Sequence, residues 1–159
     1  MKNTNNRRSG FTLIELLISL GIITLMSGLL YAGLNSVKQA ANDSRRNGDL
    51  KNVQGYLETY HLRCGHYPGD KDCGADTPAN WGALGTALSG ITGINRLPYD
   101  PVSGAPYSYW PSPDGSNYVL GATLQTDNKS ILKESYDGTD GNGYGSDCNK
   151  AALKYCIHS

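Results

Sequence analysis

One carboxylate, that of Glu15, lies near the start of a segment that otherwise carries no charge. From Phe11 to Gly33 it is the only charged side chain. A lone carboxylate at membrane depth costs about 2.5 to 3.5 kcal/mol on insertion scales unless it is protonated or finds a partner. Two arrangements would compensate Glu15: the positive end of a helix, or a nearby cationic amine.

A second set of oxygen ligands lies in the glycine-rich stretch 137–147 near the C-terminus. It contains three carboxylates and one amide, those of Asp137, Asp140, Asp147 and Asn142. Hard oxygen ligands on a flexible backbone suit Ca²⁺, although no glutamate stands where an EF-hand loop needs its bidentate ligand. The stretch therefore has two interpretations, a calcium site and an ordinary surface loop.

The four cysteines are Cys64, Cys73, Cys148 and Cys156. In a small exported domain an even number predicts two disulfides, with three possible connectivities. Cys64 and Cys73 would close a turn that contains Gly and Pro. If residues 149–155 are helical, the Cα atoms of Cys148 and Cys156 lie about 12 Å apart. That exceeds the roughly 7 Å limit between bridged Cα atoms, so these two would then pair elsewhere.

Other chemistry has no positive support in the sequence. His61 and His66 could be drawn with Cys64 and Cys73 as a zinc set, but the spacing matches no familiar zinc motif. No nucleophile elbow, phosphate loop or paired zinc-histidine helix is present, so the sequence does not indicate an enzyme. Fourteen Lys and Arg balance fourteen Asp and Glu, which gives no electrostatic argument for nucleic acid as a partner.

The apolar run places these residues relative to a membrane. Its length of about 20 residues matches the hydrocarbon thickness of a bilayer. Lys2, Arg7 and Arg8 precede it, which predicts a cytoplasmic N-terminus and an extracytoplasmic remainder. A secretory signal peptide usually has a shorter run, and the residues after Arg7-Arg8 fit a twin-arginine signal poorly.

The stretch Gly10-Phe11-Thr12-Leu13-Ile14-Glu15-Leu16-Leu17-Ile18, after this basic leader, resembles the class III signal of type IV prepilins and type II secretion pseudopilins. The resemblance implies that a prepilin peptidase cuts between Gly10 and Phe11 and that Phe11 is then N-methylated. It also implies that Glu15 pairs with the new Phe11 amine of an adjacent subunit and sets the register of a fibre. Calcium binding in a C-terminal loop and a Cys148–Cys156 disulfide are further implications.

The resemblance therefore predicts a structural subunit of a type IV pilus-like filament, polymerised through its N-terminal helix. The alternatives are a pseudopilin of a type II secretion system and, in another class, a membrane-anchored monomeric binding domain. The implied partners are copies of the chain, other pilins, the prepilin peptidase, the inner-membrane assembly machinery and membrane lipid. The precursor would cross the inner membrane once, and the product would be a cell-surface or periplasmic filament.

The expected fold class is α+β and pilin-like, with a long N-terminal helix packed on a small antiparallel sheet. The expected domains are a leader at 1–10, a transmembrane and assembly helix at 11–34, an amphipathic helix half at 35–63 and an extracytoplasmic head at 64–159. In the second helix half an apolar stripe predicts the buried side: Leu50, Val53, Leu57 and Tyr60. Charged residues are expected on its polar faces: Asp43, Arg45, Arg46, Asp49, Lys51 and Glu58.

In the head, 70–95 reads as loop with inward anchors at Trp81, Leu84, Leu88, Ile91 and Ile94. Leu-Pro-x-Asp-Pro at 97–101 again resembles the pseudopilins. Strands are predicted at 107–110 and 117–126, with a weaker third at 131–136. The period-two pattern of Tyr118, Leu120, Ala122 and Leu124 predicts one buried face on the second strand.

Overall fold

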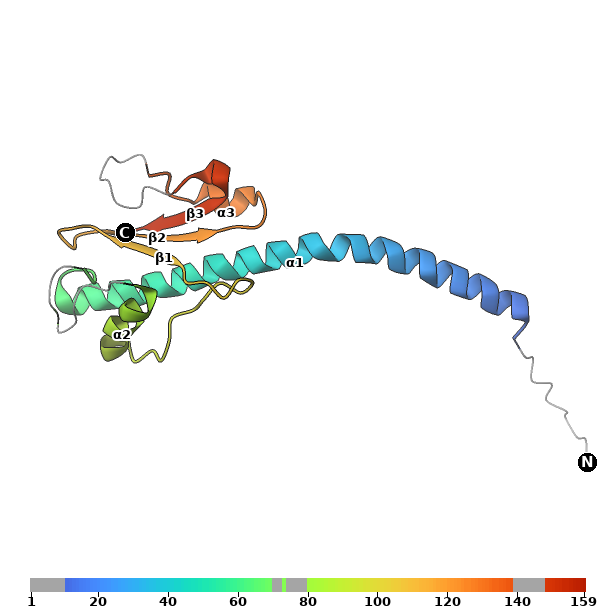
Figure 1. Ribbon diagram of the computed structural model, residues 1–159, viewed down its shortest axis with the longest axis horizontal. Helices are drawn as coiled ribbons and strands as arrows, with labels where there is room; N and C mark the ends of the chain where they lie inside the picture. The colour runs from blue at the N-terminus through green and yellow to red at the C-terminus, as the bar shows by residue number, and fades with distance from the viewer. Residues whose placement is uncertain (1–10, 70–72, 74–79, 139–147) are drawn as a thin grey trace, which may run out of the picture. The chain divides into compact units, whose positions relative to one another are not determined.

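The computed structural model describes residues 11–69, 73, 80–138 and 148–159. They form two compact units, one ending at Lys38 and the other beginning at Gln39. The elements in chain order are α1 (Leu13–Cys64), α2 (Trp81–Thr92), β1 (Ser108–Pro111), β2 (Tyr118–Thr123), α3 (Lys129–Lys133), the 3-10 helix η1 (Lys150–Ala152) and β3 (Lys154–His158) (Figure 1). Helix α1 belongs to both units.

Helix α1 begins after Thr12 and ends at Cys64. Its first part is rich in Leu and Ile, and no proline interrupts the helix. It contains a stretch long and apolar enough, by length and composition, to cross a membrane. The helix stops where the sequence predicts, because Gly65 adopts a left-handed backbone with φ of 77°, a conformation that suits glycine.

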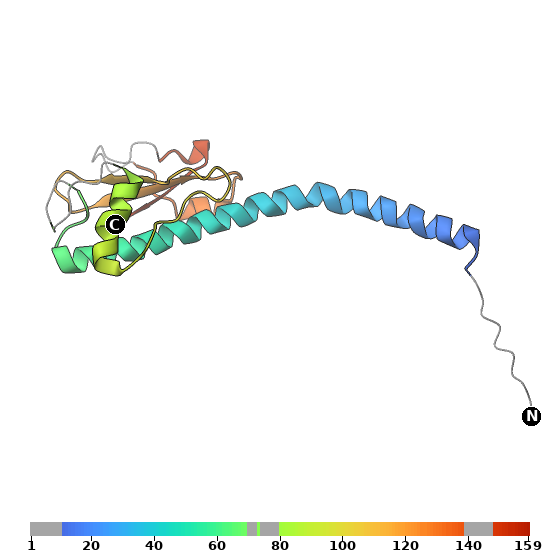
Figure 2. The ribbon, with the colours of Figure 1, turned by 60° about the horizontal axis from the view of Figure 1, so that its bottom comes forward.

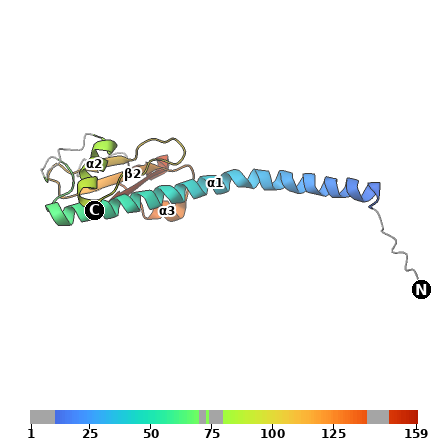
Figure 3. The same ribbon diagram turned by 90° about the horizontal axis from the view of Figure 1, so that it is seen from below.

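The core of the second unit lies against the predicted apolar stripe of α1. Leu50, Val53 and Leu57 are fully buried, and Tyr60 is 1 % exposed. They share one cluster with side chains from α2 and the sheet. Figure 2 shows α2 and the three strands beside this part of α1, and in Figure 3 α2 and α3 lie on opposite sides of it. The α+β, pilin-like fold class is confirmed.

The sheet is antiparallel with the order β1-β2-β3. Strand β2 is buried on both faces, not on one as the alternation suggests, because each face packs against a cluster of its own. Tyr118 and Leu120 join the main core. Val119, on the other face, joins a second cluster with Cys148 and Cys156.

Two sequence predictions in the head are wrong. The segment Ile131–Tyr136, predicted as a third strand, is not a strand: its first three residues end helix α3, for which the Asn128 side chain accepts bonds from two backbone N–H groups. The third strand is β3, which pairs with β2 near the C-terminus.

The segment predicted as loop contains α2, for which Asn80 is the N-cap and Gly93, with φ of 72°, the C-cap. Within it Trp81, Leu84 and Leu88 are buried as expected. Ile91 and Ile94 are partly buried against the core.

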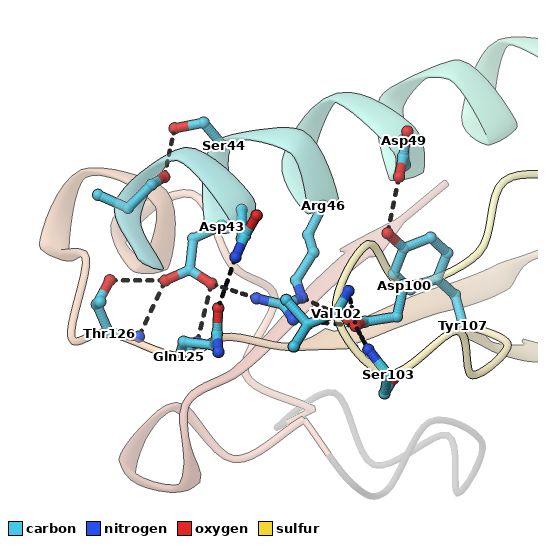
Figure 4. Close-up of polar contacts among 12 residues, drawn as sticks. Asp43, Ser44, Arg46, Asp49, Asp100, Val102, Ser103, Tyr107, Gln125 and Thr126 are labelled. Atoms are coloured by element: carbon cyan, nitrogen blue, oxygen red, sulfur yellow. Dashed lines mark hydrogen bonds and ion pairs between the residues drawn. The ribbon is translucent and has the colours of Figure 1, made fainter. Parts of the chain in front are cut away.

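Two charged residues that were expected on polar faces of α1 are buried. Asp43 is fully buried and Arg46 is 3 % exposed. The Arg46 guanidinium contacts a carboxylate oxygen of Asp43 at 2.7 Å and one of Asp100 at 2.6 Å. Asp43 also accepts backbone N–H bonds from Gln125 and Thr126 (Figure 4). This network joins α1 to the two loops that flank the sheet.

The network also sets the charge state of Asp100. Burial acts to raise the pKa of this carboxyl, but the Arg46 guanidinium and the backbone N–H groups of Ser103 and Val102 outweigh it. The pKa of Asp100 is therefore held well below its usual range.

Candidate assembly site at the start of helix α1

Thr12 and Glu15 form a reciprocal hydrogen-bonded pair at the first turn of α1. The Glu15 carboxylate oxygen Oε2 accepts from the Thr12 backbone N–H at 2.9 Å and from the Thr12 hydroxyl at 2.7 Å. In return, the Glu15 backbone N–H donates to the Thr12 hydroxyl at 3.3 Å. This is a capping box, in which two otherwise unsatisfied N–H groups of the helix end find acceptors.

The capping box decides where Glu15 lies in a single chain. Its carboxylate is at the positive end of the helix, which favours a negative charge. Oε2 takes both bonds from Thr12, and Oε1 takes none within the part of the chain that the structure describes. The arrangement therefore satisfies one oxygen inside the chain and leaves the other for a donor from outside.

Sequence reasoning found Phe11 and Glu15 but missed Thr12. The signal was present, because Thr12-x-x-Glu15 is the sequence pattern of a capping box. Phe11 directly precedes this box and is 86 % exposed. Pairing of Glu15 with a Phe11 amine of another chain stays a prediction, and Gly10, on the other side of the predicted cleavage bond, lies outside the described residues.

The surface that follows the capping box is apolar, and the hydroxyl groups of its serine and threonine residues are satisfied within the helix. Ser19, Thr24 and Ser27 each donate to a backbone carbonyl three or four residues earlier. Such bonds remove the donors that would be costly in hydrocarbon. The only carboxylate on this surface is that of Glu15.

The predicted disulfide bonds are present. Cys64 pairs with Cys73, and Cys148 pairs with Cys156 across a Cα separation of 5.8 Å. The conflict foreseen for the second pair does not arise, because only Lys150–Ala152 is helical and Leu153 turns the chain with φ of 57°. With Cys64 and Cys73 in a disulfide, the zinc set with His61 and His66 is excluded.

The candidate calcium ligands are mostly outside the described part of the chain. Asp137 is exposed, whereas Asp140, Asn142 and Asp147 lie outside the described residues. Within the described ranges no three His, Cys, Asp or Glu residues gather as a metal site would require. Calcium binding therefore stays a prediction from the sequence.

Comparison with known proteins gives two similarities. Residues 5–31 match the family model described as the prokaryotic N-terminal methylation motif. Over 112 residues the chain is 30 % identical to the type II secretion system core protein G of Pseudomonas aeruginosa, covering 65 % of this chain and 73 % of that protein. No solved structure is a significant match.

Proposed function

The chain belongs to the family of type IV pilins and type II secretion pseudopilins, and from this premise we propose that it is a structural subunit of a pseudopilus of the type II secretion class. The alignment with core protein G carries the proposal, because its 112 residues extend well beyond the N-terminal motif. A type IV pilus subunit is the second candidate. The two disulfides of the head favour it, since type IV pilins often close a C-terminal loop in this way.

In the proposed precursor, the apolar part of α1 spans the inner membrane as a monomer. The capping box and the self-bonded hydroxyls support this, because they leave few polar groups for lipid to satisfy. The proposed divisions remain a leader at 1–10, a membrane and assembly helix at 11–34, its continuation at 35–63 and the head at 64–159. The head would then lie in the periplasm.

Polymerisation would exchange lipid contacts of α1 for contacts with α1 of other subunits. Small residues let helix backbones approach closely in such an exchange. Gly21, Gly28 and Gly33 have no heavy atom within 4 Å of the position that a Cβ would take, so this surface is open. Contacts with other pilins and with an inner-membrane assembly platform belong to the same proposal.

Cleavage between Gly10 and Phe11 would create the amine that Glu15 needs. The Thr12 N–H remains an amide after this cut, so the capping box can persist with Oε2 occupied. The Oε1 atom can then accept from the methylated Phe11 amine of a neighbouring subunit. In this account the chain undergoes the chemistry, as substrate of the prepilin peptidase, and performs none.

The N-terminus of the mature chain tests this proposal. Mass spectrometry of protein recovered from sheared filaments should show a chain that starts at N-methylated Phe11. A chain that keeps Met1, or that starts near Leu34, would contradict it. Deletion of the gene should abolish export by the secretion system and leave surface pili intact, whereas the opposite phenotype would assign the chain to a pilus.

A further inference from the structure

The two disulfides close loops of nearly the same length but differ in burial. The helix-end bridge, Cys64–Cys73, joins residues 9 apart in sequence, and the sheet bridge, Cys148–Cys156, joins residues 8 apart. Loops of such similar length constrain the unfolded chain almost equally. In the folded head Cys148 is 4 % exposed and Cys156 is 1 % exposed, whereas Cys64 and Cys73 are partly exposed. The two bridges therefore differ in how well a reagent can reach them once the head has folded.

Strand β2 covers the sheet bridge. Cys156 of β3 lies opposite Gly121 of β2 in the antiparallel register, and a Cβ at Gly121 would lie 3.5 Å from the Cys156 Sγ atom. Val119, also on β2, is fully buried in the same cluster as both cysteines. Two partly buried aromatic side chains pack against this cluster: Trp110 and Tyr136. The bridge is therefore enclosed only after β3 has paired with β2.

Strand β3 is also held at its other edge, again at Cys156. The Cys156 N–H donates to the Ser135 hydroxyl at 3.0 Å, and the Cys156 carbonyl accepts from the Tyr136 N–H at 2.9 Å. To expose the sheet bridge, β3 must leave both neighbours. Such an opening is a local or global unfolding event, which is rare for the core strands of a folded domain.

The segment that follows the helix-end bridge is anchored by contacts of its own. Tyr67 is 5 % exposed, and its N–H donates to the Gly115 carbonyl at 2.9 Å. The Tyr109 hydroxyl donates to the Pro68 carbonyl at 2.7 Å. These contacts join residues 67–68 to the rest of the head without any help from the disulfide. The helix-end bridge can therefore open and close while the head stays folded.

Disulfide formation by exchange needs access to sulfur at each step. A thiolate of the chain attacks the disulfide of an oxidant, forms a mixed disulfide and releases the other oxidant sulfur as a thiolate. The second thiolate of the chain then attacks the mixed disulfide, closes the new bridge and releases the reduced oxidant. The chain loses two electrons and two protons, and the oxidant gains both. A sulfur enclosed between β2 and β3 cannot take part in these steps.

We propose that the sheet bridge closes before β3 joins the sheet, and that the helix-end bridge stays open to exchange after the head has folded. The oxidant is a disulfide-carrying protein of the compartment outside the cytoplasm, where disulfides form and persist. Only this choice of compartment rests on the proposed function. Oxidation of the sheet bridge therefore takes place after export of the chain and before completion of its sheet.

The first experiment measures access to the two bridges in the native, oxidised chain. Dithiothreitol is added to the full chain in detergent, free thiols are alkylated at intervals, and mass spectrometry of the peptides follows each cysteine. The helix-end bridge should be reduced at least about tenfold faster than the sheet bridge, because exchange requires a sulfur that the reagent can reach. Equal rates, or faster reduction of the sheet bridge, would overturn the inference.

Ser135→Ala tests whether β3 limits this access. The variant removes the acceptor of the Cys156 N–H, so reduction of the sheet bridge should be about fivefold faster, as expected for one lost hydrogen bond. Reduction of the helix-end bridge should keep its wild-type rate. Ser130→Ala, at an exposed serine of α3, is the matched control and should change neither rate. An unchanged sheet-bridge rate in Ser135→Ala would contradict the role assigned to β3.

The second experiment tests the order of closure with oxidised glutathione. The full chain is reduced and unfolded in urea, then refolded in detergent with the oxidant present from the start or added only after folding. Early oxidant should give both bridges. Late oxidant should give the helix-end bridge and at least about tenfold less of the sheet bridge. A reduced chain that stays unfolded until the sheet bridge closes gives the same order.

Closure of the sheet bridge in the folded head, at the rate of the helix-end bridge, would overturn the proposed order. Both experiments use the monomer and need no filaments. Their failure would therefore leave the proposed subunit function untouched, whereas that function fails if the mature chain does not start at Phe11. The two failures are distinguishable.

Discussion

The two halves of α1 are helical to the same degree but differ in what covers them. Between Leu13 and Lys38 the apolar side chains that the structure describes are exposed, with Leu17 at 71 % and Met26 at 63 %. In the second unit, Leu50, Val53 and Leu57 of the same helix are fully buried by the head. The apolar side chains of the second half are therefore buried within the chain, whereas those of the first half need molecules outside the chain to cover them.

Because of this difference, stability and assembly should depend on different halves of α1. Buried apolar area stabilises by about 25 cal/mol per Å², and in the second unit that gain is realised within one chain. In the first half it is realised only against lipid or other subunits. Substitutions in the head should therefore change unfolding, and substitutions in the first half should change assembly.

The largest effect on unfolding is expected from Arg46→Ala, which leaves Asp43 buried without its cation. Breaking a buried pair in this way costs about 3–5 kcal/mol. Denaturant unfolding of the full chain in detergent, followed by tryptophan fluorescence, measures the loss. Arg45→Ala is the neighbouring control, and at an exposed site it should change stability by less than about 0.5 kcal/mol. Equal losses of unfolding free energy in the two variants would show that the buried network of Arg46 stabilises the fold no more than the exposed Arg45 does.

The same helix allows a matched pair of leucine truncations. Leu57→Ala should cost about 2–5 kcal/mol of unfolding free energy, because it opens a cavity in the core. Leu17→Ala should leave the unfolding of the monomer within about 0.5 kcal/mol of wild type, since its side chain is exposed. A large loss of monomer stability from Leu17→Ala would contradict the division between the two halves.

Only part of the fold could be predicted from the sequence. The apolar stripe of α1 was readable because its period matches a helix over many residues. The burial of Arg46 was not, because its partner Asp100 is 54 residues away in sequence and a charge on a helix is normally exposed. Short apolar runs such as 131–132 fit a strand or a helix equally, and the Asn128 cap decided for α3.

The candidate site was readable for a different reason. Phe11 and Glu15 belong to a motif that is local in sequence, so no tertiary contact was needed to find them. Thr12 was equally local, and only its role as a helix cap was overlooked. The bonds that Asp49 and Glu58 accept needed the structure, because Tyr107, which donates to Asp49, and Tyr118, which donates to Glu58, are 58 and 60 residues away in sequence.

A smaller effect is expected at the outer face of the sheet. A Cβ at Gly121 would lie 2.8 Å from Cζ3 of Trp110, so Gly121→Ala must displace that ring and should cost about 1–3 kcal/mol. Gly90→Ala in α2 meets nothing within 4 Å and should stabilise by up to about 1 kcal/mol. The urea midpoints of the two variants measure both changes in stability. A Gly121→Ala variant as stable as wild type would mean that the Trp110 ring moves aside without cost.

The smallest effect is the acid dependence of the head. The pKa of Asp100 is lower in the folded chain than its unfolded value of about 3.9. The contribution of the ionised Asp100 carboxyl to the free energy of unfolding is therefore complete above about pH 4. It is lost as the pH falls toward the pKa that this carboxyl has in the folded chain. The gap in urea midpoint between wild type and Asp100→Asn should narrow steadily below about pH 4. A gap that is constant with pH would show that Asp100 does not titrate with unfolding.

The central claim is that the uncovered first half of α1 is an assembly surface whose carboxylate recognises a neighbouring chain. The most direct test is the filament yield of Glu15→Gln, measured at equal amounts of precursor in the membrane. Ser19→Ala, which removes a hydroxyl bonded within the helix, is the control. We predict normal insertion for both and a loss of roughly tenfold or more in filaments for Glu15→Gln alone, as expected for a lost charged hydrogen bond. Filaments at the wild-type level from Glu15→Gln would contradict the claim.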